Sequence, residues 1–190
     1  MKKILLSLLI ICSMAVQSQE LSWETDVKKA VEVSNATNKP MLLFFTGSDW
    51  CGWCIRLQKE VLKTPEFATW AKENVILVEL DFPRRTAQTE ELKNQNGGMQ
   101  QVFGIQGFPT ISIANATVVD GKTSFKELGR TGYLAGGPSA WIPVANEFVK
   151  LNPKTPIKTV QEIKPTEAVK EKKRTFFGRL FHSIKSFFTS

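Results

Sequence analysis

The stretch FFTGSDWCGWCI, residues 44–55, places Cys51 and Cys54 three positions apart directly after a run of apolar residues. That run, residues 41–46, is continuous and is bounded by proline and glycine, which is typical of a strand buried on both faces. Apolar residues return at helical spacing over residues 57–62. We therefore expect the two cysteines at the point where a central strand ends and a helix begins.

The residues on either side of this stretch alternate between patterns typical of helices and of strands. In order, we expect a helix over 23–38 with Ser22 as its N-cap, a strand over 41–46, a helix from 51 to 71 that bends at Thr64-Pro65, a strand over 75–81, a helix from 89 with a turn at Gly97-Gly98, strands over 110–114 and 125–129 around a turn at Asp120-Gly121, and a helix over 139–151. Strands separated by helices pair in parallel through right-handed crossovers, and the final hairpin adds an antiparallel edge. The predicted fold class is α/β, a mixed central sheet flanked by helices, and such a sheet carries its chemistry at the carboxyl ends of its central strands.

The first 18 residues have the pattern of a secretory signal peptide. Lys2 and Lys3 precede an apolar run too short to span a bilayer, and small residues allow cleavage after residue 15 or 18. Cleavage would remove Cys12 and leave Cys51 and Cys54 as the remaining thiols, in a compartment where disulfides persist. The sequence thus predicts an exported protein of the periplasm or cell envelope, with a folded domain over residues 19–151.

The C-terminal region differs from this domain in charge. Residues 19–150 carry 14 basic against 15 acidic side chains, whereas residues 151–190 carry 9 against 3, so the domain itself gives no sign of a nucleic-acid surface. Residues 152–173 read as a proline-containing linker, and residues 174–190 as an amphipathic helix. That helix would suit an anionic membrane surface, a partner's groove or the protein's own sheet, and all three interpretations stay open.

Two cysteines spaced C-x-x-C have several possible uses. A structural staple across so short a loop would contribute only about 1.9 kcal/mol, and a zinc site lacks ligands because His182 is the sole histidine and lies far away in the tail. A c-type haem site would need histidine where Ile55 stands, and cysteine-protease chemistry would need a histidine within the domain. Of these uses, the sequence favours thiol-disulfide exchange, and two inert thiols are the remaining alternative. No cofactor or metal is expected.

Disulfide exchange requires a thiolate, so the attacking cysteine needs a lowered pKa. With Ser48 or Asp49 as N-cap, Cys51 would lie in the first turn of its helix, where unpaired backbone N–H groups favour an anion. Cys54, one turn further along, would then be the resolving thiol.

The segment Trp50-Cys51-Gly52-Trp53-Cys54, together with the run from Gly104 to Thr110 that contains Phe108-Pro109, resembles the thioredoxin family over residues 21–151. The resemblance is greatest to exported bacterial members related to disulfide-reductase domains. It implies a thioredoxin fold with Cys51 as nucleophile, Cys54 as resolving cysteine and Pro109 as a cis-proline opposite the pair. It also implies that Trp50, Gly52, Trp53, Phe108 and Pro109 bind the substrate.

Three features depart from the family pattern. Thioredoxins usually carry a buried acid six residues before the nucleophile and a lysine in the next parallel strand, but the matching positions hold Phe45 and Leu77. The proton acceptor for Cys54 is therefore an open question. Trp53 replaces the usual proline between the cysteines, and residues 83–101 lengthen a connection in which Arg84-Arg85 is interpreted as a solvated pair.

The sequence thus predicts a thiol-disulfide oxidoreductase of the envelope that reduces or isomerises protein disulfides and is reset by an upstream thiol-disulfide electron donor. The alternative is a thioredoxin-fold module that binds extended polypeptide and makes little use of its cysteines.

Overall fold

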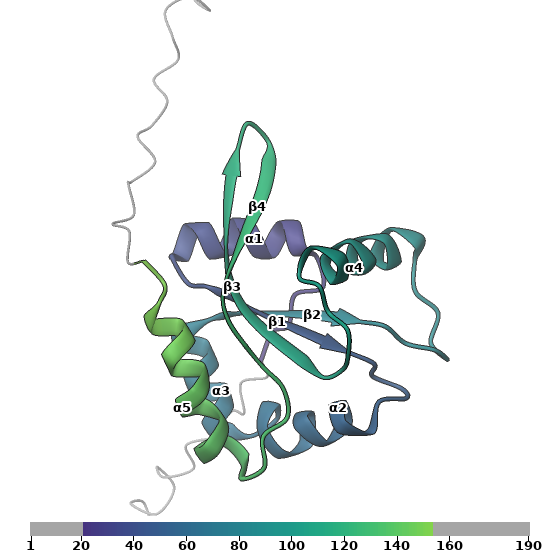
Figure 1. The fold of residues 1–190 in the computed structure, drawn as a ribbon, viewed down its shortest axis with the longest axis vertical. Coiled ribbons are helices and arrows are strands. Elements are labelled where there is room, and N and C mark those ends of the chain that lie inside the picture. Colours follow the sequence, from purple (N-terminus) through teal and green to yellow (C-terminus); the bar gives the residue numbers. More distant parts are fainter. Residues whose placement is uncertain (1–20, 154–190) are drawn as a thin grey trace, which may run out of the picture. The chain divides into compact units, whose positions relative to one another are not determined.

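The computed structural model describes residues 21–153, and within them the predicted α/β class is confirmed. The four-stranded sheet has the order β2-β1-β3-β4, in which β1 and β2 are parallel and the other neighbours are antiparallel (Figure 1). The strands are β1 Met41–Thr46, β2 Ile76–Asp81, β3 Thr110–Val119 and β4 Lys122–Thr131. The connections are therefore those of a mixed sheet closed by a hairpin.

Helices cover both faces of this sheet. They are α1 Val27–Thr37, α2 Gly52–Leu57, the π-helical turn η1 Gln58–Leu62, α3 Pro65–Asn74, α4 Glu90–Val102 and α5 Gly137–Lys150. Figure 1 shows α1 and α4 on one side of the sheet and α2, α3 and α5 on the other. The chain thus builds three layers, with β1 in the interior of the middle one.

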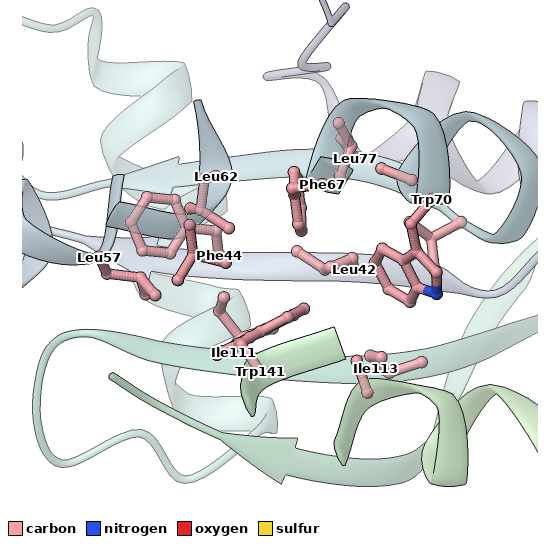
Figure 2. Packing of buried hydrophobic residues seen from close by; sticks show 14 of the residues in the cluster. Leu42, Phe44, Leu57, Leu62, Phe67, Trp70, Leu77, Ile111, Ile113 and Trp141 are labelled. Atoms are coloured by element: carbon pink, nitrogen blue, oxygen red, sulfur yellow. The ribbon is translucent and has the colours of Figure 1, made fainter. Parts of the chain in front are cut away.

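Two clusters of buried side chains fill the spaces between these layers. The cluster beneath α2, α3 and α5 joins Leu42 and Phe44 of β1 to Trp141 of α5 (Figure 2). Both cysteines also belong to this cluster. The cluster beneath α1 and α4 takes the alternate residues of β1, including Phe45. All six residues of β1 are buried, as the continuous apolar run predicts.

The first helix begins later than predicted. Asp26, not Ser22, is the N-cap of α1, and its carboxylate accepts hydrogen bonds from two first-turn N–H groups at 2.8 and 3.2 Å. The residues before it are extended, and Glu24 forms an isolated parallel bridge with Val78 on the edge of β2. The first apolar residues of the predicted helix therefore belong to an extended segment beside β2, and only the later ones belong to α1.

Two further boundaries differ from the sequence prediction. Gly97 and Gly98 do not form a turn but lie inside α4, whose N-cap is Thr89 and which therefore starts close to the predicted position. The hairpin of β3 and β4 is longer than predicted because the strands continue past the buried sheet, into exposed residues around the turn at Asp120-Gly121. Exposed polar residues give no periodic burial signal, so sequence reasoning ended both strands early.

The predicted signal peptide (1–18), the helix over 174–190 and nearly all of the linker (152–173) lie outside the described residues, so these assignments stay predictions. No helix within residues 21–153 is both long and apolar enough to cross a membrane.

Trp141 offers a direct test of this packing. The side chain is fully buried, contacts the rings of Phe67 and Trp70 at centroid distances of 5.6 and 5.9 Å, and donates its indole N–H to the Gly132 carbonyl at 3.1 Å. We expect Trp141→Ala to lower the free energy of unfolding in urea by about 3–5 kcal/mol, the usual cost of an aromatic cavity.

Val102→Ala is the matched control for this measurement. Val102 is 63% exposed at the end of α4, so its truncation should change the free energy of unfolding by no more than about 0.5 kcal/mol. Equal effects of the two substitutions would contradict the packing described above.

Candidate functional site

Cys51 and Cys54 form a disulfide at the carboxyl end of β1, with their Cα atoms 5.2 Å apart. Both residues are buried, but unequally: Cys51 retains 7% of its surface and Cys54 none. The pair therefore lies where an open α/β sheet places its chemistry, and Cys51 is the cysteine with access to solvent.

The helix α2 begins between the two cysteines and contains Cys54, and it starts one residue later than the sequence predicted. Cys51 itself is the N-cap of α2, in an extended conformation, and its sulfur accepts a hydrogen bond from the Cys54 N–H at 3.2 Å. Its own N–H donates to the Gly47 carbonyl at 2.8 Å. The predicted capping by Ser48 or Asp49 is wrong, but the consequence for chemistry is kept, because a sulfur at this position faces the N–H groups that favour a thiolate.

Ser48 and Asp49 instead connect this segment to β2 and to the loop that follows it. Ser48 donates its N–H and its hydroxyl to the Asp81 carboxylate at 2.9 and 2.6 Å. The Asp49 carboxylate accepts the backbone N–H groups of residues 84, 85 and 86 at 2.9, 2.7 and 2.9 Å. Those hydrogen bonds, foremost that of Arg84, lower the pKa of Asp49 to about 2.

An aromatic wall borders the disulfide on the side of this loop. Trp50 donates its indole N–H to the Phe82 carbonyl at 2.8 Å, and its ring meets Phe108 edge to face at 5.9 Å. Phe82 in turn stacks on Phe108 at 5.0 Å. Trp50 also covers Gly47 so closely that any Cβ there would overlap the indole ring. Phe108 precedes Pro109 through a cis peptide bond, as the family resemblance predicted.

A second aromatic group lies on the other side of the pair. Trp53, 57% exposed, packs against Tyr133 at 5.3 Å, and the Arg56 guanidinium lies 5.5 Å from the Trp53 ring centroid and 5.0 Å from that of Tyr133. The Tyr133 hydroxyl donates to Glu60 at 2.6 Å, which raises the pKa of Tyr133 and lowers that of Glu60. One aromatic group thus includes the residue before Cys51, and the other includes the residue before Cys54.

Of the predicted substrate-contact residues, Trp50 and Phe108 pack against the buried cluster that contains both cysteines. Trp53 lies between the cysteines in sequence, and Pro109 follows Phe108 through the cis bond. Gly52 is exposed between Cys51 and Trp53, with open space around its Cα. Sequence reasoning missed Phe82 and Tyr133, which reach the site from distant parts of the chain and carry no local motif. It also misread Arg84, whose side chain lies over Trp50 and is therefore more than one of a solvated pair.

The prediction about Phe45 is wrong in its geometry. Phe45 belongs to the cluster on the far side of the sheet, whereas Phe44 shares the cluster of Cys54. The residue paired with Phe44 on β2 is Glu79, whereas Leu77 pairs with Leu42. Sequence counting failed here because burial on both faces removes the alternation that would reveal which residues face the cysteines.

Glu79 is a partly buried carboxyl on the cysteine side of the sheet. Paired residues of parallel strands share a face, so Glu79 lies on the face of Phe44. Burial raises its pKa, the nearby Asp81 carboxylate raises it further, and Lys63 at the end of η1 opposes both. A carboxyl group with a raised pKa is suited to exchange a proton near neutral pH.

Over residues 21–153, His, Cys, Asp and Glu side chains nowhere gather in groups of three that could hold a metal ion.

Comparisons with known proteins agree with this geometry. The family profile described as thioredoxin-like matches residues 22–116. The disulfide bond reductase DsbH of Chlamydia pneumoniae is 35% identical over 136 residues, which cover 72% of this chain and 77% of DsbH. The thioredoxin-related protein DsbJ of the same organism is 31% identical over 96 residues, which cover 50% of this chain and 28% of DsbJ. A solved structure of DsbH oxidoreductase has a TM-score of 0.61 and 36% identity, and the match covers 70% of this chain and 86% of that chain.

The hydrogen bonds of Asp49 make a prediction about the loop over residues 82–88. Asp49→Ala should speed amide hydrogen exchange at Arg84, Arg85 and Thr86 by at least about ten-fold, because their N–H groups lose their acceptor. In the unmodified protein the same protection should be full above the ordinary pKa of 3.8 and should fade as the pH falls through about 2.

Amides in the middle of β1 serve as the internal reference for this measurement. Slower or unchanged exchange at all three loop positions in Asp49→Ala would show that the carboxylate does not hold the loop.

Proposed function

Because the chain belongs to the thioredoxin-like family and is a thiol-disulfide oxidoreductase, we propose that it reduces or isomerises disulfides of proteins in the cell envelope. The observation that carries the proposal is the Cys51–Cys54 disulfide at the end of β1, with its less buried sulfur at a helix N-terminus. The 35% identity to a protein named a disulfide bond reductase supports the reductive direction.

Reduction of a substrate needs two exchange steps. The Cys51 thiolate attacks one sulfur of the substrate disulfide, which forms a mixed disulfide and releases the first substrate thiolate. The Cys54 thiolate then attacks the Cys51 sulfur, which releases the second substrate thiolate and leaves the Cys51–Cys54 disulfide. Two electrons thus pass to the substrate, whose thiolates take up protons, and an upstream dithiol donor must reduce the protein again.

The surroundings of the pair support these roles. Cys54 is fully buried, so an external disulfide can reach only Cys51. Trp50, Gly52, Trp53, Phe108 and Pro109 are proposed to bind the substrate segment beside Cys51. The envelope location rests on the predicted signal peptide over residues 1–18, and association with a membrane or partner rests on the predicted helix over 174–190.

A trapping variant tests this function. Cys54→Ser should leave Cys51 able to attack but unable to be released, so mixed disulfides with envelope proteins should accumulate and should be freed by dithiothreitol. Mass spectrometry of the released proteins identifies the substrates and the donor. Cys51→Ser should abolish the reduction of insulin disulfides.

The double variant Cys51→Ser/Cys54→Ser is the matched control and should capture nothing through disulfides. If Cys54→Ser captures no more than this control, or if Cys51→Ser still reduces insulin, the assigned chemistry is wrong. Retained noncovalent client binding by Cys51→Ser would favour the polypeptide-binding alternative.

We assign the proton of Cys54 to Glu79 in the second exchange step. The cysteine side of β1 carries Phe44, which cannot accept a proton, and Glu79 lies beside it with a raised pKa. Glu79→Gln should slow the release of the mixed disulfide at pH 7 by about 10²-fold, the lower range for general-base catalysis. The defect should shrink at high pH, where hydroxide can replace Glu79 as the proton acceptor.

Stability measurements separate this role from damage to the fold. A raised carboxyl pKa means that stability is full below the unfolded pKa, about 4.3, and falls as pH rises through the folded pKa. Glu79→Gln removes that penalty, so it should unfold at higher urea than the parent at pH 7 and at the same urea below about pH 4. If Glu79→Gln is less stable than the parent at pH 7 and releases the mixed disulfide as fast as the parent, the assignment of Glu79 is refuted.

A further inference from the structure

The structure holds a positive charge at the edge of the disulfide site. The Arg84 guanidinium carbon lies 3.8 Å from the centroid of the Trp50 ring, and Trp50 immediately precedes Cys51. A guanidinium stacked on an aromatic face keeps its N–H groups in the plane of the stack, where their edges point outward. Among residues 21–153 no ion pair engages those donors, so they can bind a planar acceptor from solvent.

Hydrogen bonds to Asp49 hold the backbone of Arg84 in place. Its N–H and the next two donate to the Asp49 carboxylate, and Phe82 just before it accepts the Trp50 indole N–H at 2.8 Å. Phe82 also stacks on Phe108, next to the cis-proline. These hydrogen bonds and ring contacts connect the loop after β2 to Trp50 and Phe108. The Arg84 guanidinium therefore has a defined position relative to Cys51.

Arg84 differs from the arginine on the other side of the disulfide. Arg56 also lies against aromatic rings, but its charge is paired with Glu60 at 2.8 Å. Arg84 forms no ion pair with any residue between 21 and 153. Asp81, the closest acid in sequence, accepts the N–H and the hydroxyl of Ser48, and Asp49 accepts three backbone N–H groups. The rim near Trp50 therefore carries an oriented cation that has no ion-pair partner among residues 21–153.

We propose that Arg84 binds a carboxylate of the substrate polypeptide, an aspartate or glutamate close to the cysteine that Cys51 attacks. A guanidinium pairs with a carboxylate through two parallel hydrogen bonds, which fixes orientation as well as charge. The adjacent rings of Trp50 and Phe108 would cover the apolar part of the same segment. The preferred substrate is thus an extended, acidic stretch of protein that contains a disulfide.

This inference rests on the proposed function, since it names the substrate class of the same site. It assigns no new redox step: Arg84 would act on substrate binding and orientation only. A purely solvated Arg84 is the competing interpretation, and it predicts no discrimination between acidic and neutral substrates.

The test uses the reduced full-length protein and a set of disulfide-bonded peptides. Each peptide carries a single glutamate at one position from three before to three after the attacked cysteine, with a glutamine partner of the same sequence. At the position that suits Arg84, the glutamate peptide should be reduced about two- to five-fold faster, the range that exposed ion pairs produce. The preference should weaken at 0.5 M salt.

Arg84→Gln should remove this preference, so that the glutamate and glutamine peptides are reduced at equal rates and with equal KM. Arg85→Gln is the matched control, because Arg85 is an exposed neighbour of the same charge that stacks on no described ring. It should keep the preference, and both variants should unfold at the same urea concentration as the parent.

The outcomes separate the two proposals. If no position gives a glutamate preference, if Arg84→Gln retains the preference, or if Arg85→Gln loses it equally, the assignment of Arg84 is overturned while the oxidoreductase function stands. If the rate of glutathione disulfide reduction depends on Arg84 and the rates for the peptides do not, the site recognises a small anionic disulfide. The proposal of an acidic polypeptide is then wrong. If the reduced protein reduces none of the peptides, the proposed function itself fails.

Discussion

The complete burial of β1 is the constraint on which the rest of the structure depends. A strand with helices on both faces must end at the edge of the layers, and β1 ends at Thr46-Gly47. The Gly47 carbonyl then accepts the Cys51 N–H, and this hydrogen bond places the disulfide where the next helix begins. The position of the reactive sulfur therefore follows from hydrophobic burial several residues upstream.

The site around the disulfide is assembled from segments that are distant in sequence. Asp49 gathers the backbone of the loop after β2, and Tyr133 from the end of β4 reaches Glu60 on η1. Each connection uses a charged or polar group that the family motif does not contain. The motif thus provides the two sulfurs. The surrounding loops provide the aromatic side chains, the charged groups and the exposure of Cys51 to solvent, which distinguish one oxidoreductase from another.

Sequence reasoning predicted the elements that have strong periodic signals and erred where those signals are weak. The buried run of β1 and the start of α4 near Thr89 were confirmed. The start of α1 was wrong because extended residues before Asp26 pack against β2 with a spacing that resembles a helix. The face of Phe45 was wrong because both faces of β1 are apolar, so no alternation marks the side of the cysteines.

By itself the sequence determined the chemistry: two thiols at C-x-x-C spacing after a buried strand, with Phe108-Pro109 before another, are enough to indicate the thioredoxin family and disulfide exchange. Only the tertiary structure decided which other residues lie on the cysteine side of the sheet and at the rim of the site. Glu79 reaches the cysteine side through strand register, and Arg84 reaches Trp50 because Asp49 holds its loop. Local patterns reflect local burial and capping, whereas register and loop position depend on contacts between residues about 35 positions apart.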